Sequence, residues 1–192
     1  MEWVSNLNYQ PAFLSPEQAN SLLEFCARDL EWQQREIVLF GKPVLQPRLT
    51  AWCSEPGVGY SYSGLQLQAA PWHPELLALK RKVECEVGVS FNSVLANAYR
   101  DGRDSMGWHA DDEPELGANP VIASVSLGVP RQFRIRPQPP ASQPPPSGLR
   151  LAHGSLLVMR GDFQHRWQHC VTRTAKPVGL RINLTFRRIF GA

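Results

Sequence analysis

Apolar residues recur at helical spacing in two early segments of the chain. The run Ser15-Pro16-Glu17-Gln18 has the composition of a capping box with proline at the first helical position. An apolar stripe follows it at Leu22, Leu23, Phe25, Cys26 and Leu30. A second stripe follows Pro74, at Leu76, Leu77, Leu79, Val83 and Val87, and Gly88 is a suitable stop. The pattern predicts two helices within residues 1–90.

The rest of the chain has the pattern of short strands. Between the two helices, residues 37–40, 49–53 and 60–63 alternate with Gly and Pro and predict hairpins. From Phe91 onward the candidate strands are residues 94–99, 122–127, 132–136, 155–159, 166–171 and 180–187. Many short strands after a helical lead-in predict an α+β fold, mainly β: a jelly roll, or double-stranded β-helix, with N-terminal helices as support. Residues 137–148 are rich in Pro, Ser and Gln and predict an exposed loop.

Length and composition fit one globular domain. The 192 residues are 43% apolar, and we expect a single domain in which residues 1–90 supply helices and hairpins and residues 91–192 the jelly-roll core. A net charge of +3 is too common among soluble proteins to identify a nucleic-acid partner. Four scattered cysteines without a CxxC pair predict reduced thiols, and neither a secretory signal nor a membrane span is evident. We therefore expect a protein of the cytoplasm in bacteria or of the nucleus in eukaryotes.

Two stretches could form one metal site. His109 and Asp111 lie two apart, so in a strand they point to the same face and can chelate one ion. A third ligand must come from a distant segment, and both His165 and His169 are candidates. We favour His169, because its neighbours have strand character whereas His165 follows the turn-like residues 161–164. Two histidines and one carboxylate can hold Fe(II) and leave positions open. His73 and His153 have no such partners, and we expect structural roles for them.

A strand near the C-terminus has two faces of different chemistry. Leu180, Ile182, Leu184 and Phe186 share one face, and Arg181, Asn183, Thr185 and Arg187 share the other. The polar face could belong to an edge strand in solvent. If it faces the interior, two buried guanidinium groups are costly unless paired, and a bound dicarboxylate would pair them. Asn97 and Tyr99 repeat the pattern, with two polar groups two residues apart on an apolar strand.

Taken together, these motifs resemble the AlkB family of nucleic-acid dealkylating dioxygenases. The run Asn97-Ala98-Tyr99, the run His109-Ala110-Asp111-Asp112-Glu113, His169 and residues 181–187 occur in the family's order and spacing. The resemblance covers roughly residues 37–189, and it is greatest to the eukaryotic-type homologues that repair duplex DNA. The family's reaction is oxidative demethylation of bases such as 1-methyladenine and 3-methylcytosine, with Fe(II), 2-oxoglutarate and O2.

The resemblance also implies roles for individual residues. His109, Asp111 and His169 would bind iron, and 2-oxoglutarate would be held by Asn97, Tyr99, Arg181, Asn183, Thr185 and Arg187. Of the two arginines, Arg181 would pair with the distal carboxylate and Arg187 would lie at the end chelated to iron. The residues that would contact the nucleic acid are Phe40, Gly41, Lys42 and Arg48 of a hairpin, Tyr60, Ser61 and Tyr62 of a hairpin lid, and Asp112 and Glu113.

A flipped base and its backbone would need further contacts. Phe40 could fill the gap left in the stack, or it could be a core residue. Phosphates could be contacted by Arg100, Arg103, Arg131, Arg134 and Arg136. The proline-rich stretch departs from the more charged loop expected after Arg136, which affects strand context and not the chemistry. We expect a monomer that acts on alkylated DNA, duplex or single-stranded, and no membrane partner. The alternatives are an AlkB-like oxygenase acting on RNA or protein, and a non-catalytic nucleic-acid-binding relative.

Overall fold

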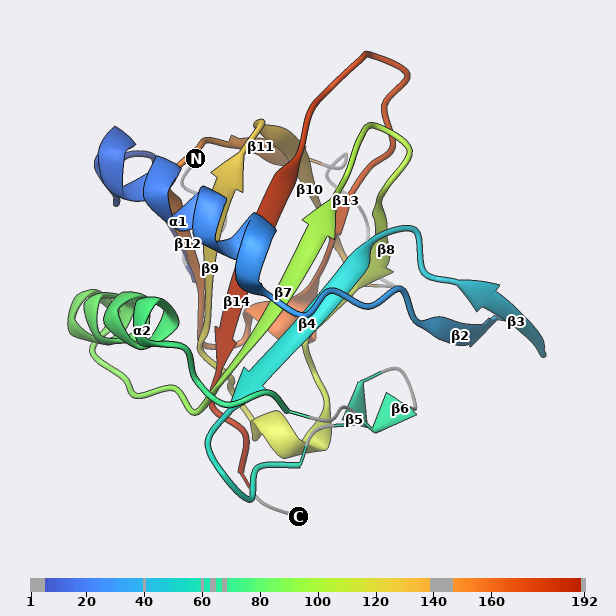
Figure 1. Cartoon of the computed structure of the whole chain (residues 1–192). Coiled ribbons are helices and arrows are strands. Elements are labelled where there is room, and N and C mark those ends of the chain that lie inside the picture. The colour runs from blue at the N-terminus through green and yellow to red at the C-terminus, as the bar shows by residue number, and fades with distance from the viewer. Residues whose placement is uncertain are drawn as a thin grey trace.

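Two antiparallel sheets face each other, and two helices cover the outer face of the larger one (Figure 1). The computed structural model describes residues 6–39, 41–59, 61–62, 65–66, 69–138 and 147–190. The larger sheet has the order β1 (Leu7–Gln10), β12 (Ser155–Met159), β9 (Ile122–Gly128), β14 (Arg181–Arg187), β7 (Ser93–Tyr99), β4 (Leu49–Ser54). The smaller has the order β11 (Ser147–Leu151), β10 (Arg131–Pro137), β13 (Trp167–Val171), β8 (Met106–His109). This is the predicted jelly roll.

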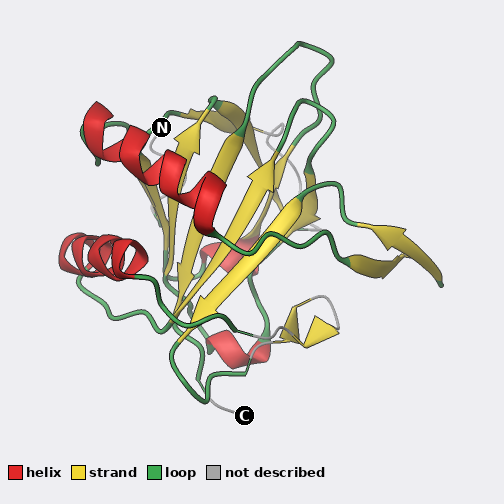
Figure 2. Cartoon of the chain, viewed as in Figure 1, coloured by secondary structure: helices red, strands yellow, loops and turns green. Residues whose placement is uncertain are grey.

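The remaining elements are two helices, two short helical turns and two small hairpins (Figure 2). The helical elements are α1 (Pro16–Asp29), α2 (Pro74–Val87), α3 (Phe163–Arg166) and the 3-10 turn Pro114–Leu116. The hairpins are β2 (Glu36–Leu39) with β3 (Lys42–Leu45), and β5 (Ser61–Tyr62) with β6 (Leu65–Gln66). Within the described residues, no helix has the length and apolar character needed to cross a membrane.

Both predicted helices are confirmed, with the predicted starts at Pro16 and Pro74 and the predicted stop at Gly88. Ser15 caps α1 with a complete capping box, since its hydroxyl accepts from the Gln18 N–H and the Gln18 side chain accepts from the Ser15 N–H. Gly88 ends α2 in the left-handed conformation at φ 76°, which glycine adopts without steric cost. His73 caps α2 by accepting from the Glu75 N–H, so its predicted structural role is also confirmed.

Two apolar cores lie on either side of the larger sheet. One packs the helices against the sheet and includes Phe25, Leu79 and Leu184. The other lies between the two sheets and includes Leu95, Ile135 and Leu157. The strand β14 is central in the larger sheet, paired with β9 on one side and β7 on the other. Its apolar face therefore packs under the helices, and its polar face points between the sheets.

Several strand predictions need correction. Residues 49–53 were predicted as a hairpin, but β4 pairs with β7 and forms an edge of the larger sheet. The strands β1, β8 and β11, each four or five residues long, were not predicted. The predicted loop 137–148 is shorter, since Pro137 ends β10 and Ser147 and Gly148 begin β11. Residues 139–146 lie outside the described part of the chain.

Candidate metal and cosubstrate site

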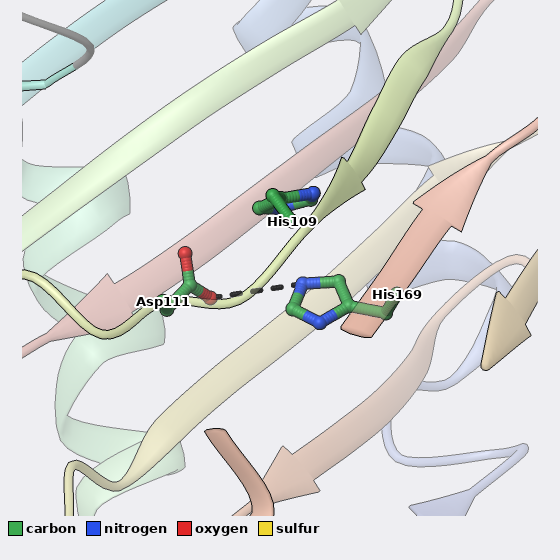
Figure 3. Close-up of side chains that lie close together, drawn as sticks. All are labelled: His109, Asp111 and His169. Atoms are coloured by element: carbon green, nitrogen blue, oxygen red, sulfur yellow. Dashed lines mark ion pairs between the residues drawn. The ribbon is translucent and has the colours of Figure 1, made fainter. Parts of the chain in front are cut away.

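Three side chains with metal-ligand chemistry meet between the sheets (Figure 3). His109 ends β8, His169 lies opposite it on β13, and Asp111 follows two residues after His109. One ligand atom of each lies within 4.8 Å of the other two. The sequence prediction that His109 and Asp111 share a strand is wrong, because β8 stops at His109. The two side chains nevertheless converge, since the loop after the strand turns Asp111 inward.

His165 is not part of this group. It lies in α3 with its ring exposed and its Nε2 against the carbonyl oxygen of Ala118. His169 is 4% exposed, and its ring is stacked on Phe133 and tilted against His109. Of the two candidates for the third ligand, the structure therefore brings His169 to the site. His153, predicted to be structural, lies elsewhere, accepting from the Gly128 N–H and contacting Asn20.

The protonation states of the three groups suit a cation. Burial and, to a smaller extent, the nearby His109 lower the pKa of His169 to about 3. Burial also lowers the pKa of His109, whose Nδ1 lies 2.9 Å from the Gly107 carbonyl oxygen. That carbonyl is an acceptor, so Nδ1 carries the proton and the Nε2 lone pair is available. Burial alone would raise the pKa of Asp111, but Arg187 and both histidines together hold it below its usual value.

The polar face of β14 lines the same cavity. The side chains of Arg181, Asn183, Thr185 and Arg187 are all at least nine-tenths buried, so the alternative of a solvent-facing edge strand is excluded. The cavity that they share with the three metal-ligand side chains has an empty volume of about 480 Å³, its mouth included.

Arg181 has unused hydrogen-bonding capacity toward this cavity. Its Nη2 donates to Ser126 Oγ at 3.0 Å and to Asn183 Oδ1 at 2.9 Å, and its guanidinium lies over the Tyr99 ring. Its Nε and Nη1 are buried and have no hydrogen-bond partner among the described residues. A buried cation with two free N–H groups matches one end of a dicarboxylate in bidentate geometry. The residues present therefore fit 2-oxoglutarate.

A chain of hydrogen bonds holds the side chains in the middle of the polar face of β14. Asn183 Oδ1 accepts from Ser124 Oγ at 2.9 Å, and Asn183 Nδ2 donates to Thr185 Oγ1 at 2.6 Å. Asn97 and Tyr99 line the cavity from β7, as expected. Ser124 and Ser126 were not predicted from the sequence, although they are two polar residues, two apart, on the apolar strand β9.

The predicted nucleic-acid contacts are only partly described. Phe40 and Tyr60 lie outside the described residues. Gly41 has φ 76°, and β2 pairs with β3 so that Leu39 is opposite Lys42. Ser61 and Tyr62 form β5. Asp112 is exposed and Glu113 half-buried, both directly after the metal-site carboxylate.

Arg48 and Arg131 lie elsewhere than expected. Arg48 was predicted on the hairpin's return arm, but its side chain is buried and its Nε donates to Asn97 Oδ1 at 2.8 Å. Arg131, predicted to contact phosphate, is 3% exposed. Its guanidinium donates to the carbonyl oxygens of Asp101, Asp104 and Thr172 at 2.8–2.9 Å. It therefore clamps two loops together and has a structural role.

The other predicted phosphate contacts are more accessible. Arg134 is exposed and Arg136 half-buried, and both lie over the ring of Trp108. Arg100 and Arg103 are exposed and form ion pairs with Asp104 and Asp101. All four side chains lie at least partly exposed at the surface.

The chain belongs to the 2OG-Fe(II) oxygenase superfamily, whose family model matches residues 6–187. Two solved structures share its fold. "The structure of OsALKBH1" superposes with a TM-score of 0.65 at 16% identity, over 95% of this chain and 98% of that chain. A 2OG-Fe(II) oxygenase family oxidoreductase from Burkholderia pseudomallei gives a TM-score of 0.62 at 14% identity, over 97% of this chain and 87% of that chain.

Comparison with curated relatives places the chain in the AlkB family of this superfamily. The chain is 42% identical to the alpha-ketoglutarate-dependent dioxygenase alkB homolog 3 of Bos taurus, over 97% of this chain and 67% of that protein. It is 40% identical to the human protein of that name over the same shares. It is 40% identical to the DNA oxidative demethylase ALKBH2 of Bos taurus, over 80% of this chain and 57% of that protein. The chain thus spans about two thirds of the alkB homolog 3 proteins.

Proposed function

We propose that this protein removes alkyl groups oxidatively from N-alkylated bases in DNA, of the 1-methyladenine and 3-methylcytosine type. The observation that carries the proposal is one cavity lined by His109, Asp111 and His169 and by the buried Arg181, whose Nε and Nη1 have no partner in the described chain. The names of the relatives, dioxygenase and DNA oxidative demethylase, support the choice of substrate.

We assign the residues that line the cavity to metal binding and to cosubstrate binding. His109, Asp111 and His169 would hold Fe(II), since two imidazoles and one carboxylate suit that ion and leave positions open. Arg181 would pair with the distal carboxylate of 2-oxoglutarate. Arg187, which already contacts Asp111, would lie near the end that binds the metal. The side chains of Asn97, Tyr99, Asn183 and Thr185 would line the space between.

The bound metal and cosubstrate supply the oxidation, and the protein supplies position and shielding. In the overall balance, O2 and 2-oxoglutarate give CO2 and succinate, which keeps one oxygen atom, while the other oxygen atom hydroxylates the alkyl carbon. The resulting hemiaminal loses an aldehyde and restores the unmodified base. Burial keeps the two histidines neutral, whereas Arg187 and the histidines hold the pKa of Asp111 low, so that its carboxylate remains ionised.

A base inside a duplex cannot reach a cavity between two sheets, so it must be flipped. The hairpin formed by β2 and β3 projects from the sheets (Figure 1). All four residues of β3 are exposed, including the apolar Val44 and Leu45. Exposed apolar side chains on a projecting hairpin support its role as the element that enters the base stack, with Phe40 as the wedge. Tyr62 would stack on the flipped base.

We further propose that the protein acts as a monomer and accepts the lesion in duplex or single-stranded DNA. Whether the protein also acts on RNA is tested with the same lesions placed in RNA. A non-catalytic role is disfavoured, because all three candidate metal ligands and both arginines of β14 are present.

The proposal is tested by mass spectrometry of oligonucleotides that carry one 1-methyladenine or 3-methylcytosine. We expect loss of one methylene mass (about 14 Da for a methyl group) only when Fe(II) and 2-oxoglutarate are both present. The same lesions in RNA and in unpaired and duplex DNA define the substrate. Unchanged mass in every substrate under those conditions would refute the proposed function.

A further inference from the structure

Asp111 is held at two points that lie outside the sheet. The strand β8 ends at His109, so within the described part of the chain Asp111 is not paired with a neighbouring strand. Its carboxylate is held by Arg187, with Nη2 at 2.7 Å from Oδ1. Its backbone N–H donates instead to the side chain of Gln164, with Oε1 at 2.9 Å. A ligand on a loop depends on such contacts for its position.

Gln164 is built into the protein more firmly than a surface glutamine. It is 0% exposed, and its Nε2 lies 3.6 Å from the sulfur of Met159. Its own backbone carbonyl accepts from Gln138 Nε2 at 2.7 Å, and the Gln138 N–H donates to the Arg166 carbonyl. A fully buried amide is costly unless its polar atoms are used. Here the carbonyl oxygen is used for Asp111.

The position of Gln164 in the chain links the two halves of the metal group. It lies in α3, the short helix that leads directly into β13, the strand that carries His169. The hydrogen bond between Asp111 and Gln164, which are 53 residues apart in sequence, therefore joins the loop that carries Asp111 to the segment that carries His169.

We propose that Gln164 is a positioning residue for the metal site: by accepting the Asp111 N–H it fixes the carboxylate relative to His109 and His169. The proposal uses the metal site that the family defines, but it does not depend on which substrate the enzyme repairs. Partners that orient a ligand typically alter metal affinity by about 10- to 100-fold when removed. Gln164 should act on metal affinity in that range without touching substrate.

The test compares three substitutions of Gln164 and one control. Gln164→Met has nearly the same size but no acceptor, Gln164→Asn keeps an amide that is one methylene too short, and Gln164→Glu keeps an oxygen at the right length. The control is Gln132→Leu, which removes the amide of an exposed glutamine on β10. The affinity of each metal-free protein for Co(II) or Mn(II) is measured by calorimetry without cosubstrate or nucleic acid, and the melting temperature without metal is measured alongside.

We expect the Met and Asn variants to bind the metal about 10- to 100-fold more weakly. The Glu variant and Gln132→Leu should bind it within about threefold of the parent, because both leave an acceptor for Asp111. If the Met variant does not fold, the Asn and Glu pair carries the comparison. Equal affinity in the parent and the Asn variant would overturn the proposal, and so would a loss in the Glu variant as large as in the Asn variant. Because binding is measured without nucleic acid, this outcome is separate from failure of the proposed function.

Discussion

Arg187 and Asp111 form a buried ion pair, with Nη2 of the arginine 2.7 Å from Oδ1 of the carboxylate. The pair joins β14, whose polar face lines the cavity, to the loop that carries Asp111. Arg181, six residues earlier on the same strand, makes no such contact and hydrogen-bonds Ser126 and Asn183 instead. Two arginines that look equivalent in the sequence therefore have different partners, and their substitution should have different effects.

Replacing each arginine by lysine separates these roles. Arg181→Lys removes the planar fork at the distal end of the cavity, and Arg and Lys are not interchangeable at bidentate sites. We expect it to raise the 2-oxoglutarate KM by roughly tenfold or more, the cost of about one charge-assisted hydrogen bond, with metal affinity unchanged. Arg187→Lys should also raise the 2-oxoglutarate requirement and should weaken metal binding as well.

Titrations of 2-oxoglutarate at saturating Fe(II), and of metal without cosubstrate, measure both quantities. An unchanged 2-oxoglutarate requirement in both variants would contradict the assignment of β14 as the cosubstrate strand. Weakened metal binding in Arg181→Lys alone would mean that the two roles are reversed.

Arg131 offers a stability test outside the metal site. Its side chain is buried and satisfies three backbone carbonyls, from Asp101, Asp104 and Thr172. Arg131→Ala leaves buried acceptors without a donor, and each such group costs about 1–3 kcal/mol. We expect urea denaturation to show a loss of at least about 2 kcal/mol in the free energy of unfolding. Arg134→Ala, exposed on the same strand, should change it by no more than about 0.5 kcal/mol. Similar values for the two variants would argue against the clamp.

The sequence predicted the chemistry of the site better than the boundaries of the fold. Residues two apart share a face of a strand whatever the fold, so the polar row on β14 and the pair Asn97 and Tyr99 could be recognised directly. The choice of His169 over His165 also followed from strand character. The order of strands could not be predicted, because pairing between distant segments leaves no local pattern.

What the sequence could not supply were the contacts made by single buried polar side chains. Arg131 and Arg48 look like surface arginines in the sequence, yet the fold buries both against backbone or amide oxygens. Gln164 gives no signal at all, because one glutamine in a turn has no periodicity. These partners exist only once distant loops are packed together.

Substitution of Phe40 tests whether the protein uses this side chain on duplex DNA and not on single-stranded DNA. Phe40 follows β2 at the projecting hairpin, and its placement lies outside the described residues. If its ring replaces a flipped base, Phe40→Ala should lower the repair rate of a lesion in a duplex by tenfold or more, taking stacking as about 1–3 kcal/mol, and should leave the single-strand rate nearly unchanged. The melting temperature of the protein should barely move.

The alternative is a core phenylalanine, whose replacement by alanine costs about 3–5 kcal/mol and lowers both rates together. The two rates and the melting temperature are therefore measured on one preparation. A large drop in melting temperature with an unchanged ratio of duplex to single-strand rates would return Phe40 to the core.

We propose that the group His109, Asp111 and His169 carries out oxidative dealkylation with the β14 arginines. The most direct measurement is the amount of aldehyde and of succinate formed with a methylated oligonucleotide, Fe(II) and 2-oxoglutarate. The account predicts equal amounts of the two products from the parent protein and from His165→Ala, and neither product above background from His169→Ala. Aldehyde release that persists in His169→Ala and disappears in His165→Ala would contradict it.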